Sequence, residues 1–179
     1  AMLFQAGALF DSLSVGENLA YPLRRREPID EAGIPAKVAE MLALVGLPAN
    51  YDLRLPLQLS GGEAQRVGVA RALAAGAKLM LMDEPFGALD AITRDAMHDQ
   101  TERIWAERGL TILFVTHNVR EAARLGDRVI VMAPDPCRIA TEAIVDLPRP
   151  RRMEDADVAR MSGQLHDVLR EFDLGDHRG

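Results

Sequence analysis

Cysteine is almost absent from this sequence, and long apolar runs are missing altogether. The single cysteine, Cys137, excludes a disulfide within the chain and is typical of a protein in a reducing compartment. No apolar run approaches the roughly 18 residues that span a bilayer, and no signal peptide with a basic start, an apolar stretch and a cleavage site is present. We therefore expect any membrane role to depend on a partner protein.

The sequence also lacks an excess of positive charge. Its 21 Lys and Arg residues face 27 Asp and Glu residues, which gives a net charge of −6 at pH 7. Such a chain has no basic field for a nucleic-acid backbone, so no nucleic acid is expected among its partners. Two positive runs, residues 24–26 and 149–152, are interpreted as solvated surface.

What remains is the composition of a globular protein with one core. The 179 residues are 48% hydrophobic and 27% charged, without internal repeats or low-complexity tracts. The chain opens with Ala1 and then directly with the apolar run Met2-Leu3-Phe4. Because domains seldom begin in the middle of a strand, we expect that an N-terminal portion is missing.

Hydrophobic periodicity and breakers predict alternating strands and helices. Helices are predicted over residues 14–23, 35–45, 61–75, 91–108, 119–125 and 156–172. Buried strands are predicted over 79–82 and 111–115, and another strand over 128–132, with a strand end at Leu3 and a hairpin-like segment over 138–146. Ser14 and Glu17 form a capping-box pattern. In the helix over 91–108 we expect Ile92, Met97, Ile104 and Trp105 to face the core. The alternation predicts an α/β fold with a largely parallel sheet.

A Gly-rich stretch opens the predicted helix over 61–75. It reads Leu59-Ser60-Gly61-Gly62-Glu63-Ala64-Gln65-Arg66. Two glycines let backbone N–H groups approach an anion, and a helix start adds unpaired N–H groups and the positive end of its dipole. A phosphate is the natural ligand. An ordinary serine N-cap with a glycine turn explains this stretch alone equally well.

Two adjacent carboxylates, Asp83 and Glu84, end the predicted strand over 79–82. The carboxyl edge of a parallel sheet is where α/β proteins bind ligands. One carboxylate can hold Mg²⁺, directly or through water, and its neighbour can accept a proton from an attacking water. Taken alone, Asp-Glu-Pro at this point also fits a helix-capping turn.

Two further polar residues extend the pattern. Asp90 follows Pro85 by five residues, and His117 follows the strand over 111–115. A lone histidine at a strand end is more often structural than catalytic. We nevertheless expect His117 and the Asp83-Glu84 pair to border one cleft, because both follow neighbouring strands of the predicted sheet.

Together these residues resemble a known family. In chain order, Gln5, residues 59–65, 79–84, 88–90 and His117 are similar to the Q-loop, signature, Walker B, D-loop and switch-histidine motifs of ABC-transporter ATPases. The resemblance covers nearly the whole chain. It implies a P-loop NTPase-type α/β fold with a helical subdomain, about residues 14–75. A partial ATPase domain is expected over 1–147, and a C-terminal extension with one helix over 148–179.

The resemblance also implies a role for each matching residue. Asp83 would organise Mg²⁺, Glu84 would be the general base for ATP hydrolysis, and His117 would sense the γ-phosphate. Gln5 would link nucleotide and metal to the surface that meets the membrane partner. The remaining nucleotide-binding positions belong to a head-to-tail dimer: Ser60, Gly61, Gly62 and Glu63 of the signature, where Glu63 replaces a more usual Gln, and Asp90 of the D-loop.

No stretch matches the phosphate-binding motif G-x-x-x-x-G-K-[S/T]. We therefore expect at least one strand, P-loop and helix, on the order of 30 residues, to precede Ala1. A homodimer of this chain alone should not hydrolyse ATP, and the fragment should expose sheet and core and should aggregate or need a partner. Alternatively, the chain could complete one site with an intact partner subunit.

The resemblance extends to a transporter class. Residues 83–93, 114–127 and 138–151 are similar to the ATPases of nitrate, sulfonate and taurine importers, whereas 4–10 and 15–18 resemble phospholipid-trafficking ABC systems. We favour the importer because it matches more of the chain. Implied partners are permease subunits, a second ATPase subunit and, indirectly, a solute-binding protein, at the cytoplasmic face of the inner membrane. A non-transport ABC ATPase and a non-catalytic ABC remnant are the other interpretations.

Overall fold

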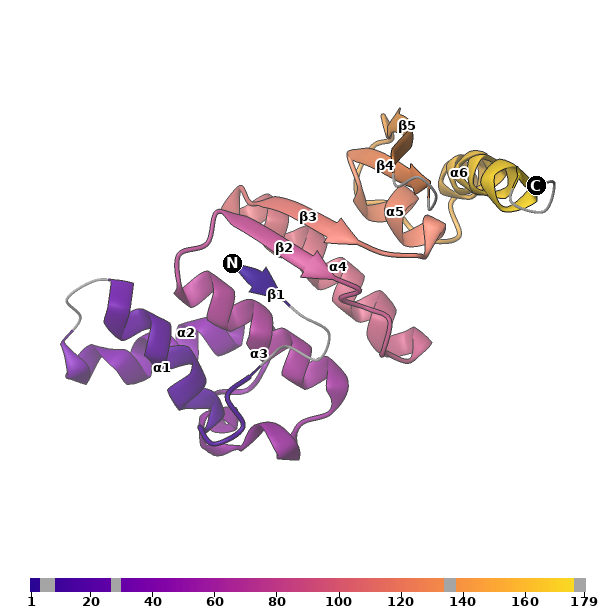
Figure 1. Cartoon of the computed structure of the whole chain (residues 1–179). Helices are drawn as coiled ribbons and strands as arrows, with labels where there is room; N and C mark the ends of the chain where they lie inside the picture. Colours follow the sequence, from indigo (N-terminus) through magenta and orange to yellow (C-terminus); the bar gives the residue numbers. More distant parts are fainter. Residues whose placement is uncertain (4–8, 27–29, 134–137, 176–179) are drawn as a thin grey trace. The chain divides into compact units, whose positions relative to one another are not determined.

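The computed structural model describes residues 1–3, 9–26, 30–133 and 138–175. The chain divides into two compact units, Ala1–Val115 and Thr116–Gly179, whose elements are labelled in Figure 1. The boundary predicted after residue 147 lies inside the second unit. Each unit has a hydrophobic core of its own.

The first unit is built on a three-stranded parallel sheet. Its strands are β1 (Met2–Leu3), β2 (Leu79–Asp83) and β3 (Thr111–Val115), with β2 in the middle. Helices α3 (Gly61–Ala74) and α4 (Ala91–Arg108) supply core residues, and Met80 and Met82 of β2 lie in the same core. This arrangement confirms the predicted parallel α/β sheet.

The sheet departs from the prediction in the burial of its second face. Leu79 and Leu81 of β2 are 49% and 36% exposed, and Leu113 of β3 is 57% exposed. The strands over 79–82 and 111–115 were expected to be fully buried, as parallel strands covered on both faces are. Their side chains alternate instead, because the core of the first unit lies against one face only.

A mainly helical segment separates β1 from β2. It contains α1 (Val15–Arg26), the 3₁₀ turn η2 (Glu31–Gly33), α2 (Ile34–Leu44) and the 3₁₀ turns η3 (Ala49–Leu53) and η4 (Pro56–Gln58). The capping box is confirmed, since the Ser14 N–H donates to Glu17 Oε2 (2.7 Å) and the Glu17 N–H donates to Ser14 Oγ (3.2 Å). The interpretation of residues 14–75 as a helical subdomain remains a prediction.

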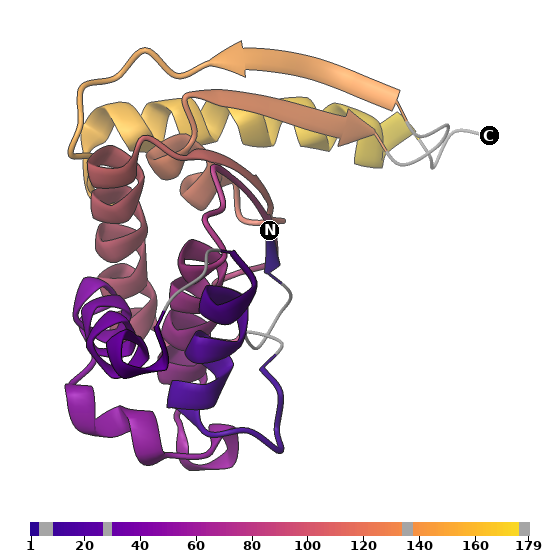
Figure 2. The same ribbon diagram turned by 90° about the vertical axis from the view of Figure 1, so that its left-hand side faces the viewer.

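The second unit combines α5 (Val119–Leu125), β4 (Arg128–Ala133), β5 (Arg138–Ile144) and α6 (Ala156–Gly175). β4 and β5 form an antiparallel pair with a register irregularity between Val131 and Met132. Figure 2 shows this ribbon lying along α6, and Val131 of β4 shares a core with Val158 and Leu165 of α6. The third predicted strand therefore belongs to an antiparallel ribbon and not to the parallel sheet.

Two side chains lie where the sequence interpretation did not expect them. Ile92 was predicted to face the core but is 85% exposed, because it lies in the first turn of α4 beyond the buried Met97 and Ile104. Arg151 was assigned to solvated surface but is only 3% exposed. Among the helices that the structure describes, none is both long enough and apolar enough to cross a bilayer.

Candidate functional site

The N-terminus of α3 is built by a reciprocal cap. Ser60 Oγ accepts from the Glu63 N–H (3.3 Å), and Glu63 Oε2 accepts from the Ser60 N–H (2.7 Å). Ser60 and Gly61 remain exposed. The simple capping role that the sequence also allowed is therefore present, and the same exposed turn carries the helix-start N–H groups that an anion would need.

Glu63 has a second partner that the sequence did not indicate. The Tyr51 hydroxyl, from η3, donates to Glu63 Oε1 (2.6 Å). This bond, together with that from the Ser60 N–H, holds the pKa of Glu63 below its usual range, and the same bond raises the pKa of Tyr51. Glu63 is thus an ionised carboxylate whose two oxygens are both engaged inside the cap.

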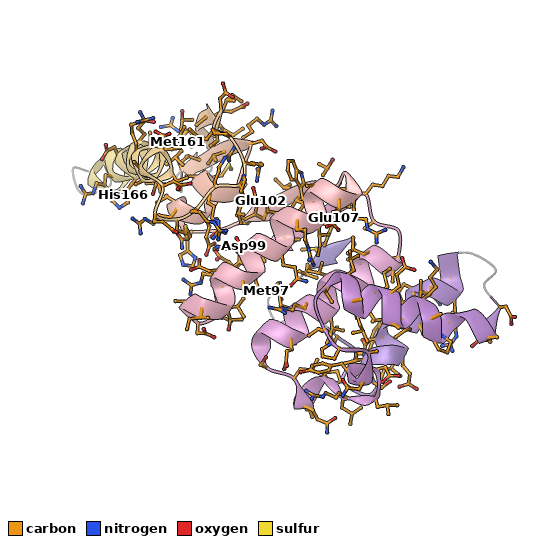
Figure 3. The ribbon with its side chains drawn as sticks, turned by 180° about the vertical axis from the view of Figure 1, so that it is seen from behind. Met97, Asp99, Glu102, Glu107, Met161 and His166 are labelled. Atoms are coloured by element: carbon orange, nitrogen blue, oxygen red, sulfur yellow. The ribbon has the colours of Figure 1, made fainter. Side chains whose placement is uncertain are left out.

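The second glycine of the signature is required by the packing of α3 on α4. A β-carbon at Gly62 would lie 2.5 Å from Thr93 Cγ2, closer than real contacts allow, whereas one at Gly61 would meet only Leu89 Cδ2 at 3.8 Å. Further along the same helix pair, Arg66 Nε donates to Met97 Sδ (3.4 Å); Met97 is labelled on α4 in Figure 3. Only a glycine lets the two helix starts approach so closely.

Asp90 caps α4 at this same contact. Its carboxylate accepts from the Thr93 N–H (3.0 Å) and from the Thr93 hydroxyl (2.7 Å), and these bonds lower the pKa of Asp90. Because Thr93 touches Gly62, the structure brings the predicted signature and the predicted D-loop residue together through one threonine. The spacing Asp90-x-x-Thr93 is a capping pattern from which this bond could have been predicted.

Asp83 and Glu84 lie at the carboxyl edge of the parallel sheet, as predicted. Asp83 is the exposed last residue of β2 and is in register with Val115. The Glu84 N–H donates to the Val115 carbonyl (3.0 Å), and Glu84 has a left-handed backbone with φ of +44°. A non-glycine residue in this region carries backbone strain of about 1–3 kcal/mol, a feature that clusters at functional sites.

The turn after Glu84 is fixed by a buried aromatic residue. Phe86 is buried and lies edge-on against the His98 ring (4.5 Å between centroids) and the Phe114 ring (6.5 Å). These two contacts hold the segment between β2 and α4 against His98 of α4 and against Phe114 of β3. The strained turn at Glu84 is therefore held by the sheet hydrogen bond before it and the Phe86 contacts after it.

The donor set at this edge fits Mg²⁺ of a nucleotide. Asp83 offers an exposed carboxylate at the end of β2. Mg²⁺ is usually held in this way, by one or two carboxylates with waters and substrate phosphate oxygens completing the coordination. Gln5, the other predicted metal contact, lies outside the described residues.

His117 belongs to the second unit, in the turn between Thr116 and the N-cap of α5, and its side chain is exposed. Asn118 Oδ1 caps α5 by accepting from the N–H groups of Arg120 (3.0 Å) and Glu121 (3.4 Å). Since Glu84 belongs to the first unit, the expectation that His117 and Glu84 border one cleft remains a prediction.

A cavity of about 400 Å³ lies at the opposite edge of the first unit. Its lining includes Lys78 and Leu110, which immediately precede β2 and β3, and the charged side chains of Lys37, Glu40 and Arg108. Because Asp83 and Glu84 lie at the carboxyl ends of the strands, this cavity is separate from the predicted nucleotide site.

Comparisons with known proteins point to one family. A family model described as "ABC transporter" matches residues 1–87. The chain is 41% identical to a taurine import ATP-binding protein TauB of Chromobacterium violaceum, over 98% of this chain and 67% of the relative. It is 48% identical to TauB of Pelagibacter ubique over 79% of the chain and 52% of the relative.

Further relatives agree. An aliphatic sulfonates import ATP-binding protein SsuB of Rhodopseudomonas palustris is 46% identical over 76% of this chain and 47% of the relative. Among solved structures, the dimeric ATP-binding cassette MJ0796 bound to ADP and Pi is similar with a TM-score of 0.70 and 30% identity, over 82% of this chain and 63% of that one. The chain spans about half the length of the first two relatives it matches, 52% and 47%.

Proposed function

This chain belongs to the ABC transporter family, and on that basis we propose that it is part of the ATP-binding and ATP-hydrolysing subunit of an importer for a small sulfonate such as taurine. The relatives named for taurine and aliphatic sulfonates support this cargo class. The nitrate and phospholipid alternatives find no support in those names. Cargo itself would be recognised by other subunits, because the ATPase acts on nucleotide.

One observation carries the proposal: the exposed starts of α3 and α4 meet through Gly62 and Thr93 in the unit that also presents Asp83 and Glu84 at its sheet edge. A helix start opened by glycines suits the γ-phosphate of an ATP held by a second subunit. Asp90, at the same contact, would face that second subunit. Two copies arranged head to tail would then each complete the other's site.

Each residue of the edge has a chemical task in this proposal. Asp83 would hold Mg²⁺, which neutralises charge on the phosphates when nucleotide is bound. Glu84 would accept a proton from the attacking water, and its constrained turn limits the directions its side chain can take. His117 would orient the γ-phosphate and the water. The phosphate-binding loop must be supplied together with these residues for hydrolysis to occur.

The proposed partners follow from this role. Two permease subunits would receive the mechanical work, a second ATPase subunit would complete each nucleotide site, and a solute-binding protein would deliver cargo to the permease. The complex would place this chain at the cytoplasmic face of the inner membrane. Uptake of labelled taurine and of a short alkanesulfonate, in cells that lack and then regain this subunit, tests the cargo class.

The proposal is tested most directly by Glu84→Gln in the assembled transporter. Nucleotide binding should be retained, because the phosphate contacts remain, whereas turnover should fall by about 100-fold or more, because the base is removed. Glu107→Gln is the matched control, since Glu107 lies on α4 with an exposed side chain that forms a surface ion pair with Arg103 (3.9 Å). Turnover at the wild-type rate in the Glu84 variant contradicts the role of Glu84.

A further inference from the structure

The exposed turn that carries His117 rests on a buried carboxylate. Glu121, in the first turn of α5, is 3% exposed. Its Oε2 accepts from the Thr116 hydroxyl (2.8 Å), and its Oε1 accepts from Asn118 Nδ2 (3.3 Å). Thr116 and Asn118, the two residues that flank His117, are thus each bonded to one of the two carboxylate oxygens of Glu121.

Further bonds close this arrangement. The Asn118 N–H donates to Thr116 Oγ1 (3.1 Å), so the threonine hydroxyl is a donor to Glu121 and an acceptor from the backbone of the turn. Asn118 Oδ1 is occupied by the N–H groups of Arg120 and Glu121 at the start of α5. The backbone on both sides of His117 is therefore fixed, while the imidazole itself remains exposed.

Capping of α5 does not account for all of these contacts. The Asn118 side chain already accepts from the N–H groups of Arg120 and Glu121 in this seven-residue helix, and Thr116 lies two residues outside the N-cap. A buried carboxylate is unfavourable unless its oxygens are bonded, and here both are directed at the flanks of a single exposed residue. The arrangement is what a residue that positions His117 requires.

We propose that Glu121 is the positioning residue of the switch histidine, holding the His117 turn through Thr116 and Asn118 so that the imidazole meets the γ-phosphate in one orientation. This inference rests on the proposed function, in which His117 contacts nucleotide. A catalytic side chain must be held to within about 0.5 Å of its productive geometry, and a misplacement of about 1 Å can reduce the rate about 100-fold. A carboxylate suits the task because both of its oxygens are acceptors, whereas glutamine offers one.

Two variants and one control test the inference. Glu121→Gln keeps the shape but leaves one of the two donors without an acceptor, and Thr116→Val removes the hydroxyl while leaving Glu121 in place. Glu142→Gln is the control, because Glu142 is a carboxylate of the same unit that forms a surface ion pair with Arg128 (3.4 Å). In the full chain, hydrogen exchange of the backbone N–H of Asn118 should accelerate about fivefold in Thr116→Val, because its acceptor is removed. The exchange should remain unchanged in the control.

In the assembled transporter, Glu121→Gln and Thr116→Val should each lower kcat for ATP about tenfold or more while KM stays within about twofold, because binding contacts are kept and orientation is lost. The amides of residues 122–125, inside α5, should keep their protection in Thr116→Val, which separates loss of positioning from loss of the helix. Wild-type kcat in Thr116→Val with accelerated Asn118 exchange overturns the inference, as does loss of protection throughout α5.

His117→Ala separates the inference from the proposed function. If turnover is lost in His117→Ala but kept in Thr116→Val and Glu121→Gln, the proposed function stands and the role of Glu121 is wrong. If His117→Ala itself turns over at the wild-type rate, the role of His117 in the proposed function fails, and the positioning role fails with it. Should Glu121→Gln not fold, Thr116→Val decides between the outcomes.

Discussion

The two glycines of the signature look equivalent in the sequence but have different surroundings. We expect Gly62→Ala to lower the free energy of unfolding by about 1–3 kcal/mol, because its methyl group would overlap Thr93 Cγ2 at 2.5 Å. Thr93 cannot easily turn away, since its hydroxyl is bonded to Asp90 (2.7 Å) and a β-branched side chain has few rotamers. Urea unfolding of the chain measures the change.

Gly61→Ala is the matched control for this prediction. Its new methyl group would make an ordinary contact with Leu89 (3.8 Å), so stability should stay the same or rise with the better helix propensity of alanine. Thr93→Ser removes the obstructing methyl group and keeps the hydroxyl, so the double variant Gly62→Ala/Thr93→Ser should recover most of the loss. Equal losses in the two glycine variants contradict the steric explanation.

The bond between Tyr51 and Glu63 predicts a pH effect. Because the folded-state pKa of Glu63 is lowered, its contribution to stability is present above the unfolded value of about 4.3 and is lost as pH falls through the folded value. Tyr51→Phe removes the 2.6 Å bond, so the pKa of Glu63 should move back up towards its usual value. Carboxyl ¹³C titration by NMR measures this, with Tyr21→Phe as the control. An unchanged Glu63 titration in Tyr51→Phe contradicts the prediction.

These residues also mark how far site residues can be predicted from sequence. The sequence correctly placed Ser60, Gly61 and Gly62 at a helix start, and it placed Asp83 and Glu84 at a strand end. These placements were predictable because helix caps and strand ends depend on residues nearby in the chain. Tyr51 reaches Glu63 across twelve positions through a 3₁₀ turn, and no periodic pattern indicates such a contact. The predicted roles of these residues in binding nucleotide remain predictions.

At the scale of secondary-structure elements, one buried guanidinium joins the C-terminal end of α5 to the segment that follows β5. Arg151 donates to the carbonyls of Gly126 (2.6 Å), Leu147 (2.9 Å) and Val145 (3.0 Å), and also to those of Ala123 and Arg124. The last carbonyls of a helix lack partners within the helix, so Arg151 completes the C-terminus of α5. Arg149 adds a bond to the Leu125 carbonyl (2.6 Å) and an ion pair with Asp127 (2.8 Å).

We expect Arg151→Lys to lower the free energy of unfolding of the second unit by about 3 kcal/mol, because an ammonium group lacks the planar fork that reaches several carbonyls at once. Hydrogen exchange of the amides in α5 and β5 measures the loss. Arg152→Ala is the control, since the neighbouring Arg152 side chain is exposed. A change below about 0.5 kcal/mol in Arg151→Lys contradicts the structural role of the guanidinium.

The boundaries of the helices were largely predictable, whereas strand partners were not. The helices over 61–75 and 91–108 agree with α3 and α4 to within one residue, because Ser60 and Asp90 cap their starts and Gly109 ends α4. β4 was assigned to the parallel sheet, since an apolar run indicates a strand but not its neighbour. The run at 149–152 was taken for surface because charge alone does not reveal the carbonyls that Arg151 reaches.

For the molecule as a whole, the proposed head-to-tail dimer predicts separable effects at Ser60. Ser60→Asp keeps an equally good N-cap for α3 but places a negative charge where the γ-phosphate is expected. In the full ATPase, Glu84→Gln should bind ATP without turning it over, so ATP should promote dimers of this variant. The additional Ser60→Asp change should abolish these dimers, because the added charge repels the γ-phosphate. Analytical ultracentrifugation with and without ATP measures this.

Ser12→Asp, at an exposed turn in the same unit, is the control for added charge. ATP-dependent dimers that persist in the Ser60 variant contradict a phosphate contact by the signature. Loss of α3 protection in the variant would instead reveal a failed cap, which the amide of Glu63 reports directly, because it donates to Ser60 Oγ in the native chain (3.3 Å).

The division into two units was the least predictable property of the whole chain. Residues 115 and 116 are joined without any glycine or proline, and the short polar run from Thr116 to Asn118 fits a strand end followed by a helix cap, so composition does not indicate that the two compact units meet there. The predicted boundary at 147 followed the Pro-Arg run, which the structure packs into the second unit through Arg151. The family and the α/β class were predictable because they depend on short motifs in a fixed order and not on where the units begin and end.

The left-handed turn at Glu84 has an evolutionary consequence. An L-residue with φ of +44° carries backbone strain of about 1–3 kcal/mol that glycine escapes. A single Glu84→Gly change would therefore relax the chain while deleting the proposed base, and urea unfolding of this variant beside Glu84→Ala measures the gain. Selection for stability alone would favour glycine at this position, whereas the proposed role in hydrolysis would require an acid there.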